Sequence, residues 1–197
     1  MVAKESAMNI DHEGKNIANS IAMIITLVSF TMLFAVFFLG YAIFRFNAQE
    51  WPPMGMDRVG LGIPSLSTLF IVLSSITLVV VERSIKKGEK KVAKYVGLLS
   101  LILGFSFIGS QFTLWESLRD RGIFQGTGIY ASLIYGFTWT HVGHMVLAVI
   151  LKLWLVAKVF RVPELKELKE NVVRNISAFW HFLGVVWVLI YITLFVL

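Results

Sequence analysis

Five stretches of the chain contain no Asp, Glu, Lys or Arg, and each is 21 to 30 residues long. They cover residues 16–44, 59–81, 95–115, 122–151 and 175–197. A helix needs about 20 mainly apolar residues to cross the hydrocarbon of a bilayer, so each stretch can cross once but not twice. The pattern predicts an all-α membrane protein. We expect five transmembrane helices in a single domain over residues 1–197, at approximately 19–45, 63–82, 95–115, 127–157 and 175–197.

The composition agrees with this pattern and excludes several classes of protein. The chain is 57% hydrophobic and 15% charged, whereas soluble proteins have about 45–50% apolar and about 25% charged residues. It contains no cysteine, which excludes disulfides, thiolate metal sites and iron–sulfur clusters. Its formal net charge is +6, but the basic residues flank the apolar stretches, so we expect no nucleic-acid partner.

The basic residues are divided unevenly between the two sides of the membrane that five crossings imply. The larger set is Lys4, Lys15, Arg83, Lys86, Lys87, Lys90, Lys91, Lys94, Lys152, Lys158, Arg161, Lys166, Lys169 and Arg174. The smaller set is Arg45, Arg58, Arg119 and Arg121. The positive-inside rule therefore predicts a cytoplasmic N-terminus and a C-terminus on the outer side.

The segments that join the helices on the basic side have their own patterns. Residues 84–94 are predicted to form a basic turn that faces anionic lipid. Residues 163–170 are predicted to form a short amphipathic helix on the membrane surface, whose apolar face carries Leu165, Leu168 and Val172.

Two further features lie on the third and fourth apolar stretches. Ser100-x-x-x-Gly104 and Ser106-x-x-x-Ser110 have the spacing of small residues at which helix backbones approach closely. We interpret them as packing positions inside this chain rather than between two copies. Lys152, just after the fourth stretch, is expected to extend its amine to the inner interface of the membrane.

Three histidines lie within the apolar stretches. His141 and His144 are three residues apart and share one helix face, while His181 lies nearer the inner end of the last helix. One interpretation is haem or metal ligation, because imidazole binds iron, copper and zinc. Haem would require an opposing histidine at the same depth, and His181 lies at a different depth. We therefore favour hydrogen bonding across helices or to a neighbouring subunit.

The apolar stretches also contain no carboxylate. Proton pumps and ion-coupled carriers need buried ionisable groups along their route, so a small transporter is disfavoured. Taken together, the residues predict a structural membrane subunit. We expect no catalytic, cofactor-binding or metal-binding residue in this chain.

Three motifs occur in order along the chain and resemble one family. They are Trp51-Pro-Pro-Met-Gly55, then Gly128-Ile-Tyr130 followed by His141-Val-Gly-His144, and finally Trp180-His-Phe182 with Val185-Val-Trp187. Together they resemble subunit III of the haem–copper terminal oxidases, which include cytochrome c oxidase and bacterial quinol oxidase, in its short five-helix bacterial form. The resemblance covers almost the whole chain.

The resemblance implies a non-catalytic accessory subunit of a respiratory oxidase in the bacterial inner (plasma) membrane. Such an oxidase reduces oxygen to water and pumps protons, and its haems and copper lie in subunits I and II. The expected partners are subunit I above all, subunit II, other respiratory subunits and membrane lipids. Two alternatives remain: a partner subunit of a bacterial nitric oxide reductase, and an independent haem-binding membrane protein.

The resemblance also assigns roles to individual residues. The structural or subunit-interface positions are Tyr130, His141, His144, Trp180, His181 and Trp187. The outer-loop motif consists of Trp51, Pro52 and Pro53. Lys158 falls where the family often has an arginine that contacts lipid phosphate, so a bound phospholipid is expected there.

The chain departs from the family pattern at three acidic positions. Phe30 follows Ser29 where the family often has glutamate, Leu114 ends a Gln-x-x-Glu stretch, and Gly184 replaces an aspartate. We therefore expect this subunit to lack any role that needs an ionisable group in its interior.

Overall fold

The described part of the chain forms five long helices. The computed structural model describes residues 2–53 and 59–197, without the side chains of 2–13, 15 and 16. The helices are α1 (Val2–Asn47), α2 (Gly62–Lys87), α3 (Lys90–Asp120), α4 (Ile129–Arg161) and α5 (Glu170–Tyr191). Each contains a segment long and apolar enough to span a membrane. The prediction of an all-α protein with five membrane-length helices is therefore confirmed.

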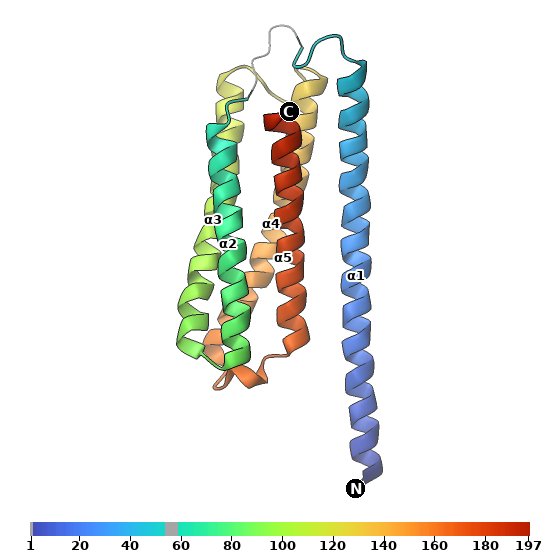
Figure 1. Cartoon of the computed structure of the whole chain (residues 1–197), viewed down its shortest axis with the longest axis vertical. Coiled ribbons are helices and arrows are strands. Elements are labelled where there is room, and N and C mark those ends of the chain that lie inside the picture. The colour runs from blue at the N-terminus through green and yellow to red at the C-terminus, as the bar shows by residue number, and fades with distance from the viewer. Residues whose placement is uncertain (1, 54–58) are drawn as a thin grey trace.

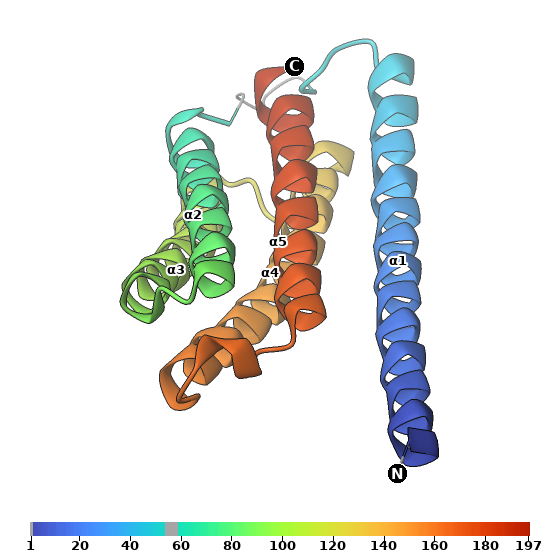
Figure 2. The ribbon, with the colours of Figure 1, turned by 60° about the horizontal axis from the view of Figure 1, so that its bottom comes forward.

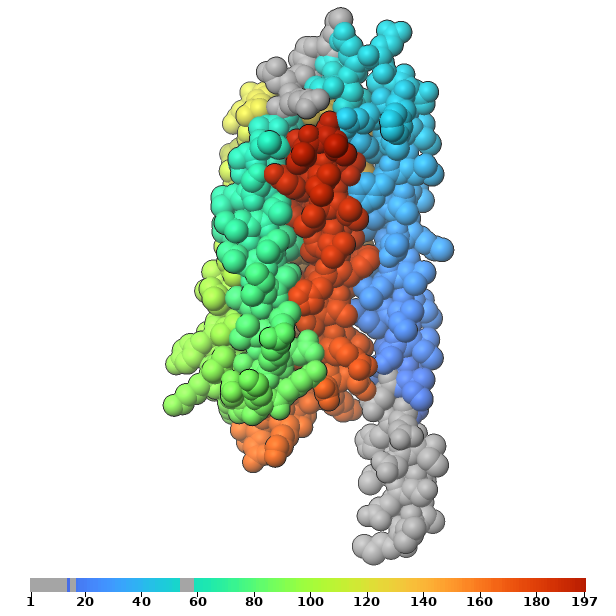
Figure 3. All heavy atoms as spheres, in the orientation of Figure 1, coloured from blue at the N-terminus to red at the C-terminus, as the bar shows by residue number. Residues whose placement is uncertain are grey.

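Helices α2 to α5 form a bundle, and α1 lies along one side of it (Figures 1 and 2). The space-filling view shows α1 packed beside α5 (Figure 3). One end of the bundle holds the α2–α3 turn and the α4–α5 connector, residues 162–169. There Lys90 Nζ donates hydrogen bonds to the carbonyl oxygens of Val162 at 2.5 Å and Pro163 at 3.0 Å. We call this end, which carries most of the loop lysines, the basic end.

Helices α2 and α3 are joined through serine side chains. The Ser67 and Ser110 hydroxyls lie 2.7 Å apart, and Ser74 Oγ donates to the Ser100 carbonyl at 2.9 Å. Lipid offers no hydrophobic drive for helices to associate, so small residues and interhelical hydrogen bonds must supply the attraction. Ser100 is 1% exposed and Gly104 is also buried. Ser100, Gly104 and Ser110 pack inside the chain as expected, whereas Ser106 is only partly buried.

Helix α1 contacts the bundle through aromatic rings. The Phe37 and Phe38 rings lie 5.3 Å and 5.0 Å from the Phe137 ring of α4. Phe34 and Tyr41 are buried on the same face of α1. Offset and edge-to-face aromatic contacts of this kind add about 0.5–1.5 kcal/mol per pair beyond simple packing. This aromatic face holds α1 against α4 and α5.

Two predictions for the basic end are wrong. The expected turn over 84–94 is much shorter, because α2 continues to Lys87 and α3 begins at Lys90. Gly88, with φ 76°, makes the reversal in the left-handed conformation that glycine adopts without strain. Residues 163–170 form a single 3-10 turn, Leu165–Glu167, instead of an amphipathic helix, since the backbone on both sides of it is extended.

Candidate functional site

The central histidine lies inside an aromatic cluster between four helices. His141 on α4 is 0% exposed. Its ring centre lies 6.0 Å from Phe34 of α1, 5.8 Å from Phe107 of α3 and 5.5 Å from Trp187 of α5. Neither ring nitrogen has a hydrogen-bond partner among the described residues. The imidazole of His141 therefore makes aromatic ring contacts at the point where α1, α3, α4 and α5 meet.

The second histidine of the pair links α1 to α4. His144 is half-buried, and its Nδ1 lies 2.6 Å from the Thr140 carbonyl oxygen one turn earlier. That bond assigns the ring proton to Nδ1, because a carbonyl only accepts. The edge of its ring meets Phe30 at 4.4 Å between centroids. The two histidines do share one helix face, and that face is directed at α1 of the same chain.

His181 lies apart from this pair. Trp187, which contacts His141, is six residues further along α5, so His181 is displaced by roughly 9 Å along the helix axis. Within the described part of the chain, no three His, Asp or Glu side chains form a group that could hold a metal ion. The structure does not bring the three histidines together.

Two of the sequence motifs meet at the end opposite the basic end. Trp51, which precedes a cis peptide bond to Pro52, places its ring edge-on to Tyr130 at 5.3 Å and to Tyr41 at 5.5 Å. Pro53 follows in the same loop, whereas Met54 and Gly55 of this motif lie outside the described residues. The loop motif and the start of α4 are therefore one packing unit, which also includes the end of α1.

The two tryptophans of the last motif are both fully buried. Trp187 donates from Nε1 to Thr68 Oγ1 of α2 at 3.0 Å and meets the Phe107 ring at 4.9 Å. Trp180 lies closer to the basic end, and its ring centre is 3.4 Å from Lys152 Nζ. Each tryptophan thus connects α5 to other helices of the bundle.

The expectation for Lys152 is wrong. Its side chain is 1% exposed, and Nζ donates to Ser74 Oγ at 2.8 Å and to the Ser100 carbonyl at 3.0 Å. Side chains in a helix lean towards its N-terminus, and the N-terminus of α4 lies at the end opposite the basic end. The lean therefore carries the Lys152 amine away from the interface and into the bundle. Sequence reasoning missed this group, although helix direction was a signal that could have found it.

Phe30, Leu114 and Gly184 stand at the three positions where the family pattern has acidic residues, and each packs against neighbouring residues. Phe30 lies between His144 and Phe179, and Leu114 is 1% exposed. At Gly184, an added Cβ would already lie 3.4 Å from Ser75 Oγ of α2. These positions are apolar or closely packed. The interior nevertheless contains an ionisable group, which is Lys152.

An apolar groove of about 570 Å³ lies between α1 and the α4–α5 pair, in the half of the molecule nearer the basic end. Its walls include Met23 and Phe30 from α1, Trp154 from α4 and Phe179 from α5. Asn175 Nδ2 donates to the Asn19 carbonyl at 3.4 Å across the two sides. The groove opens on the surface of the bundle.

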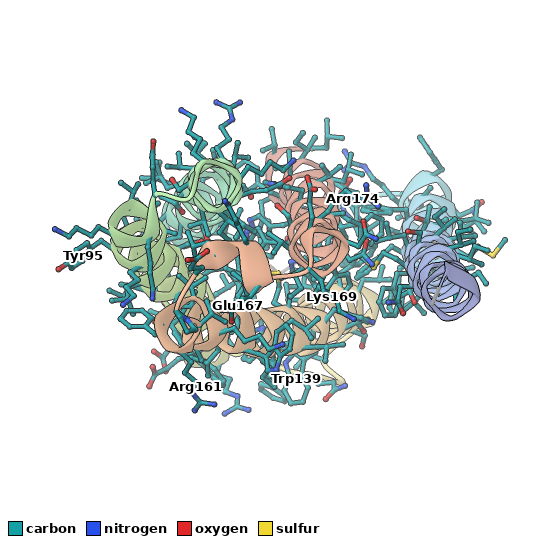
Figure 4. The ribbon with its side chains drawn as sticks, turned by 90° about the horizontal axis from the view of Figure 1, so that it is seen from below. Tyr95, Trp139, Arg161, Glu167, Lys169 and Arg174 are labelled. Atoms are coloured by element: carbon teal, nitrogen blue, oxygen red, sulfur yellow. The ribbon has the colours of Figure 1, made fainter. Side chains whose placement is uncertain are left out.

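A smaller pocket of about 320 Å³ adjoins the groove and shares Trp154 with it. Its lining includes two cations, Lys158 and Arg161, and one anion, Glu167. Lys158 Nζ lies 4.3 Å from the centre of the Trp154 ring. Figure 4 looks onto the basic end and shows Arg161 pointing away from the bundle, with Glu167 on the connector. A basic pocket therefore lies next to an apolar groove.

The chain is similar to a well-defined set of proteins. A family model described as cytochrome c oxidase subunit III matches residues 2–197. Cytochrome c oxidase subunit 3 of Thermostichus vulcanus is 25% identical over 181 residues, which are 90% of this chain and 86% of that protein. Subunit 3 of Synechocystis is 23% identical, over 94% of this chain and 78% of that protein. Subunit 3 of Alkalihalophilus pseudofirmus is 25% identical, over 85% of this chain and 81% of that protein.

Proposed function

The chain belongs to the cytochrome c oxidase subunit III family, and from this membership we propose that it is a non-catalytic accessory subunit of a respiratory haem–copper oxidase. In this role it packs against subunit I, while subunits I and II carry the haems and copper. The observation that carries the proposal is the family match over residues 2–197. Support comes from the motif residues Tyr130, His141 and Trp187, whose rings pack against aromatic rings of other helices or of the Trp51 loop.

Purification from native membranes in a mild detergent tests this function. We expect the chain to co-purify with a larger membrane subunit that contains haem, in a complex that consumes oxygen. A complex that instead consumes nitric oxide would assign the chain to a nitric oxide reductase. A chain that migrates alone and shows haem absorbance by itself would support the independent haem protein. A colourless chain without a haem-bearing partner would contradict all three assignments.

We propose further that the basic end faces the cytoplasm of a bacterial cell. The positive-inside rule supports this orientation, because the loop lysines and arginines gather at that end. The chain contains no cysteine, so single cysteines can report the side of the membrane. Lys91→Cys and Asp120→Cys place one exposed thiol at each end of α3. Labelling of Lys91→Cys by an impermeant maleimide in intact cells would contradict the orientation.

The groove and the adjoining basic pocket are proposed to bind one anionic phospholipid. An acyl chain would lie in the groove between α1 and α4–α5, and the phosphate would lie between Lys158 and Arg161. Trp154 borders both spaces, at the level where tryptophan favours the boundary between hydrocarbon and headgroups. The opposite charges of Lys158 and the lipid phosphate give the attraction, and Glu167 offsets part of it.

Removing the two cations should release this lipid. Each basic residue near an anionic lipid surface contributes about 1 kcal/mol, or about fivefold in affinity. We therefore expect Lys158→Ala with Arg161→Ala to retain anionic phospholipid at least about tenfold more weakly, as measured by native mass spectrometry of the purified protein. Lys91→Ala is the control, because Lys91 is exposed at the same end and lies outside the pocket. Equal lipid loss in both variants would contradict a specific site.

His144 offers a test of the subunit contact. We expect His144→Ala to weaken association with the haem-bearing subunit by about 1–3 kcal/mol, because a partly buried hydrogen-bonding ring is lost. The measurement is the fraction of chain retained on the complex through a graded detergent wash. The thermal stability of the free variant must be measured beside it, since His144 also contacts Phe30 of α1. Unchanged retention would show that His144 serves only this internal contact.

A further inference from the structure

Four helices each contribute one residue to a buried cluster around the Lys152 amine. Ser74 comes from α2, Ser100 from α3, Lys152 from α4 and Trp180 from α5. The amine donates to Ser74 Oγ at 2.8 Å and to the Ser100 carbonyl at 3.0 Å, and it lies 3.4 Å from the centre of the Trp180 ring. All four residues are at most 1% exposed. The cluster is therefore closed to solvent and lipid.

The hydrogen bonds of the two serines leave acceptors for this amine. Ser74 Oγ donates its proton to the Ser100 carbonyl at 2.9 Å, and Ser100 Oγ donates to the Ser74 carbonyl at 3.1 Å. With its only proton committed, Ser74 Oγ can accept from Lys152 and cannot donate to it. The Trp180 ring offers its negative face to the amine. An ammonium group has three N–H donors, and here it meets three acceptors.

The walls of the cluster are shaped for the amine and the indole ring. A Cβ added at Gly104 of α3 would lie 3.1 Å from Trp180 Cη2 and 3.8 Å from Lys152 Nζ. Glycine at this position leaves the space that both groups occupy. Trp180 Nε1 has no hydrogen-bond partner among the described residues, so the ring takes part through its face and not through its N–H. The surroundings thus suit a small cation.

The position is deep in the bundle. Ser74 is 12 residues from Gly62 and 13 from Lys87, at the middle of α2. A lysine at such depth is costly, so it is expected to have a role. Among the described residues, no carboxylate contributes a contact to the cluster. Oxygen dipoles and the aromatic face must therefore stabilise the amine.

We propose that Ser74, Ser100 and Trp180 form an internal binding site for a primary alkylammonium group, and that the side chain of Lys152 occupies this site. The bound ammonium group joins the α2–α3 pair to the α4–α5 pair. The cluster is the place where a single group contacts α2, α3 and α5 from α4. It also positions Trp180, the first residue of the Trp-His-Phe motif. The site goes beyond the accessory role proposed above and does not depend on it.

Chemical rescue tests the site in the full-length chain in detergent. Lys152→Ala removes the side chain beyond Cβ, and the missing part is equivalent to n-propylammonium. We expect this variant to unfold about 10 °C below the wild type, because three helices lose their shared partner. Added n-propylammonium should recover at least half of that difference with saturation. 1-Propanol, which has a similar shape without the charge, should recover little.

Control variants separate a cation site from simple cavity filling. Lys94→Ala also removes a lysine that lies over an aromatic ring, that of Phe160 at 4.8 Å, but Lys94 is only partly buried and lies outside the cluster. It should lose little stability and show no rescue. The proposal would be overturned if propylammonium stabilised Lys152→Ala no more than the wild type. It would also be overturned if 1-propanol rescued Lys152→Ala as well as propylammonium does.

A second set of variants applies if Lys152→Ala does not fold. Trp180→Phe keeps an aromatic face and Trp180→Leu removes it. In the wild-type background the leucine variant should unfold several degrees below the phenylalanine variant. In a Lys152→Met background this difference should vanish, because no ammonium remains to contact the ring. A difference that persists unchanged would show that the ring serves packing alone and would reject the proposal.

Discussion

Trp187→Ala is expected to lower the free energy of unfolding by about 3–5 kcal/mol, the range for truncating a buried aromatic side chain. The indole is 0% exposed and fills the space between Phe107 and His141. Its removal leaves a cavity at the meeting point of α3, α4 and α5, and it also removes the hydrogen bond to Thr68. The measurement is unfolding in mixed micelles, followed by circular dichroism.

Two comparisons define the origin of that loss. Trp187→Phe keeps a ring and removes only the N–H, so we expect a smaller loss of about 1–2 kcal/mol. Thr68 Oγ1 would still donate to the Pro64 carbonyl at 2.8 Å. Trp139→Ala is the matched control, because the Trp139 side chain is 52% exposed on the outer face of α4 (Figure 4). If Trp139→Ala cost as much as Trp187→Ala, the aromatic cluster would not be the structural centre of the fold.

Gly104→Leu is expected to cost about 3 kcal/mol or more, because it overpacks a closed contact. A Cβ alone would lie 3.1 Å from Trp180 Cη2 and 3.4 Å from Val149 Cγ2, and leucine adds three further carbon atoms. Trp180 cannot retreat without leaving Lys152, so the clash would separate α3 from α4 and α5. The same variant should therefore also reduce retention of the haem-bearing partner in a detergent wash.

Gly109→Leu provides a matched control on the same helix. Gly109 is exposed, and a Cβ there has no atom within 4 Å. Leucine favours a helix over glycine by up to about 1 kcal/mol, so this control should be neutral or slightly stabilising. The two substitutions are chemically identical, but only the one at Gly104 is expected to destabilise the protein. A loss of stability at both positions would attribute the effect to α3 itself rather than to its contact with Trp180.

Some of the motif residues are neighbours in the structure, and others are not. The Trp51 loop and Tyr130 meet, as do His141 and Trp187, although nothing in the separate motifs stated these pairs. His181 stays apart from the histidine pair. Helix periodicity assigns each residue to a depth and to a face of its own helix. It does not say which face of another helix lies opposite, and that information decides these contacts.

Lys152 shows the same limit most clearly. By position it belongs with the interfacial lysines, and Lys158, six residues later on α4, is indeed exposed. The difference arises because the Lys152 side chain leans along α4 into a space that Ser74, Ser100 and Gly104 leave open. These three residues lie on two other helices, between 48 and 78 positions away in the sequence.

The sequence by itself determined the number of membrane helices, their order and the family of the chain. These follow from uninterrupted apolar length and from motif spacing, which are properties of a single chain read in one direction. The tertiary structure decided the aromatic enclosure of His141, the groove beside Lys158 and the burial of the Lys152 amine. Each of these is formed by side chains from several helices, whose relative rotation is set by mutual packing and by polar groups that lipid cannot satisfy.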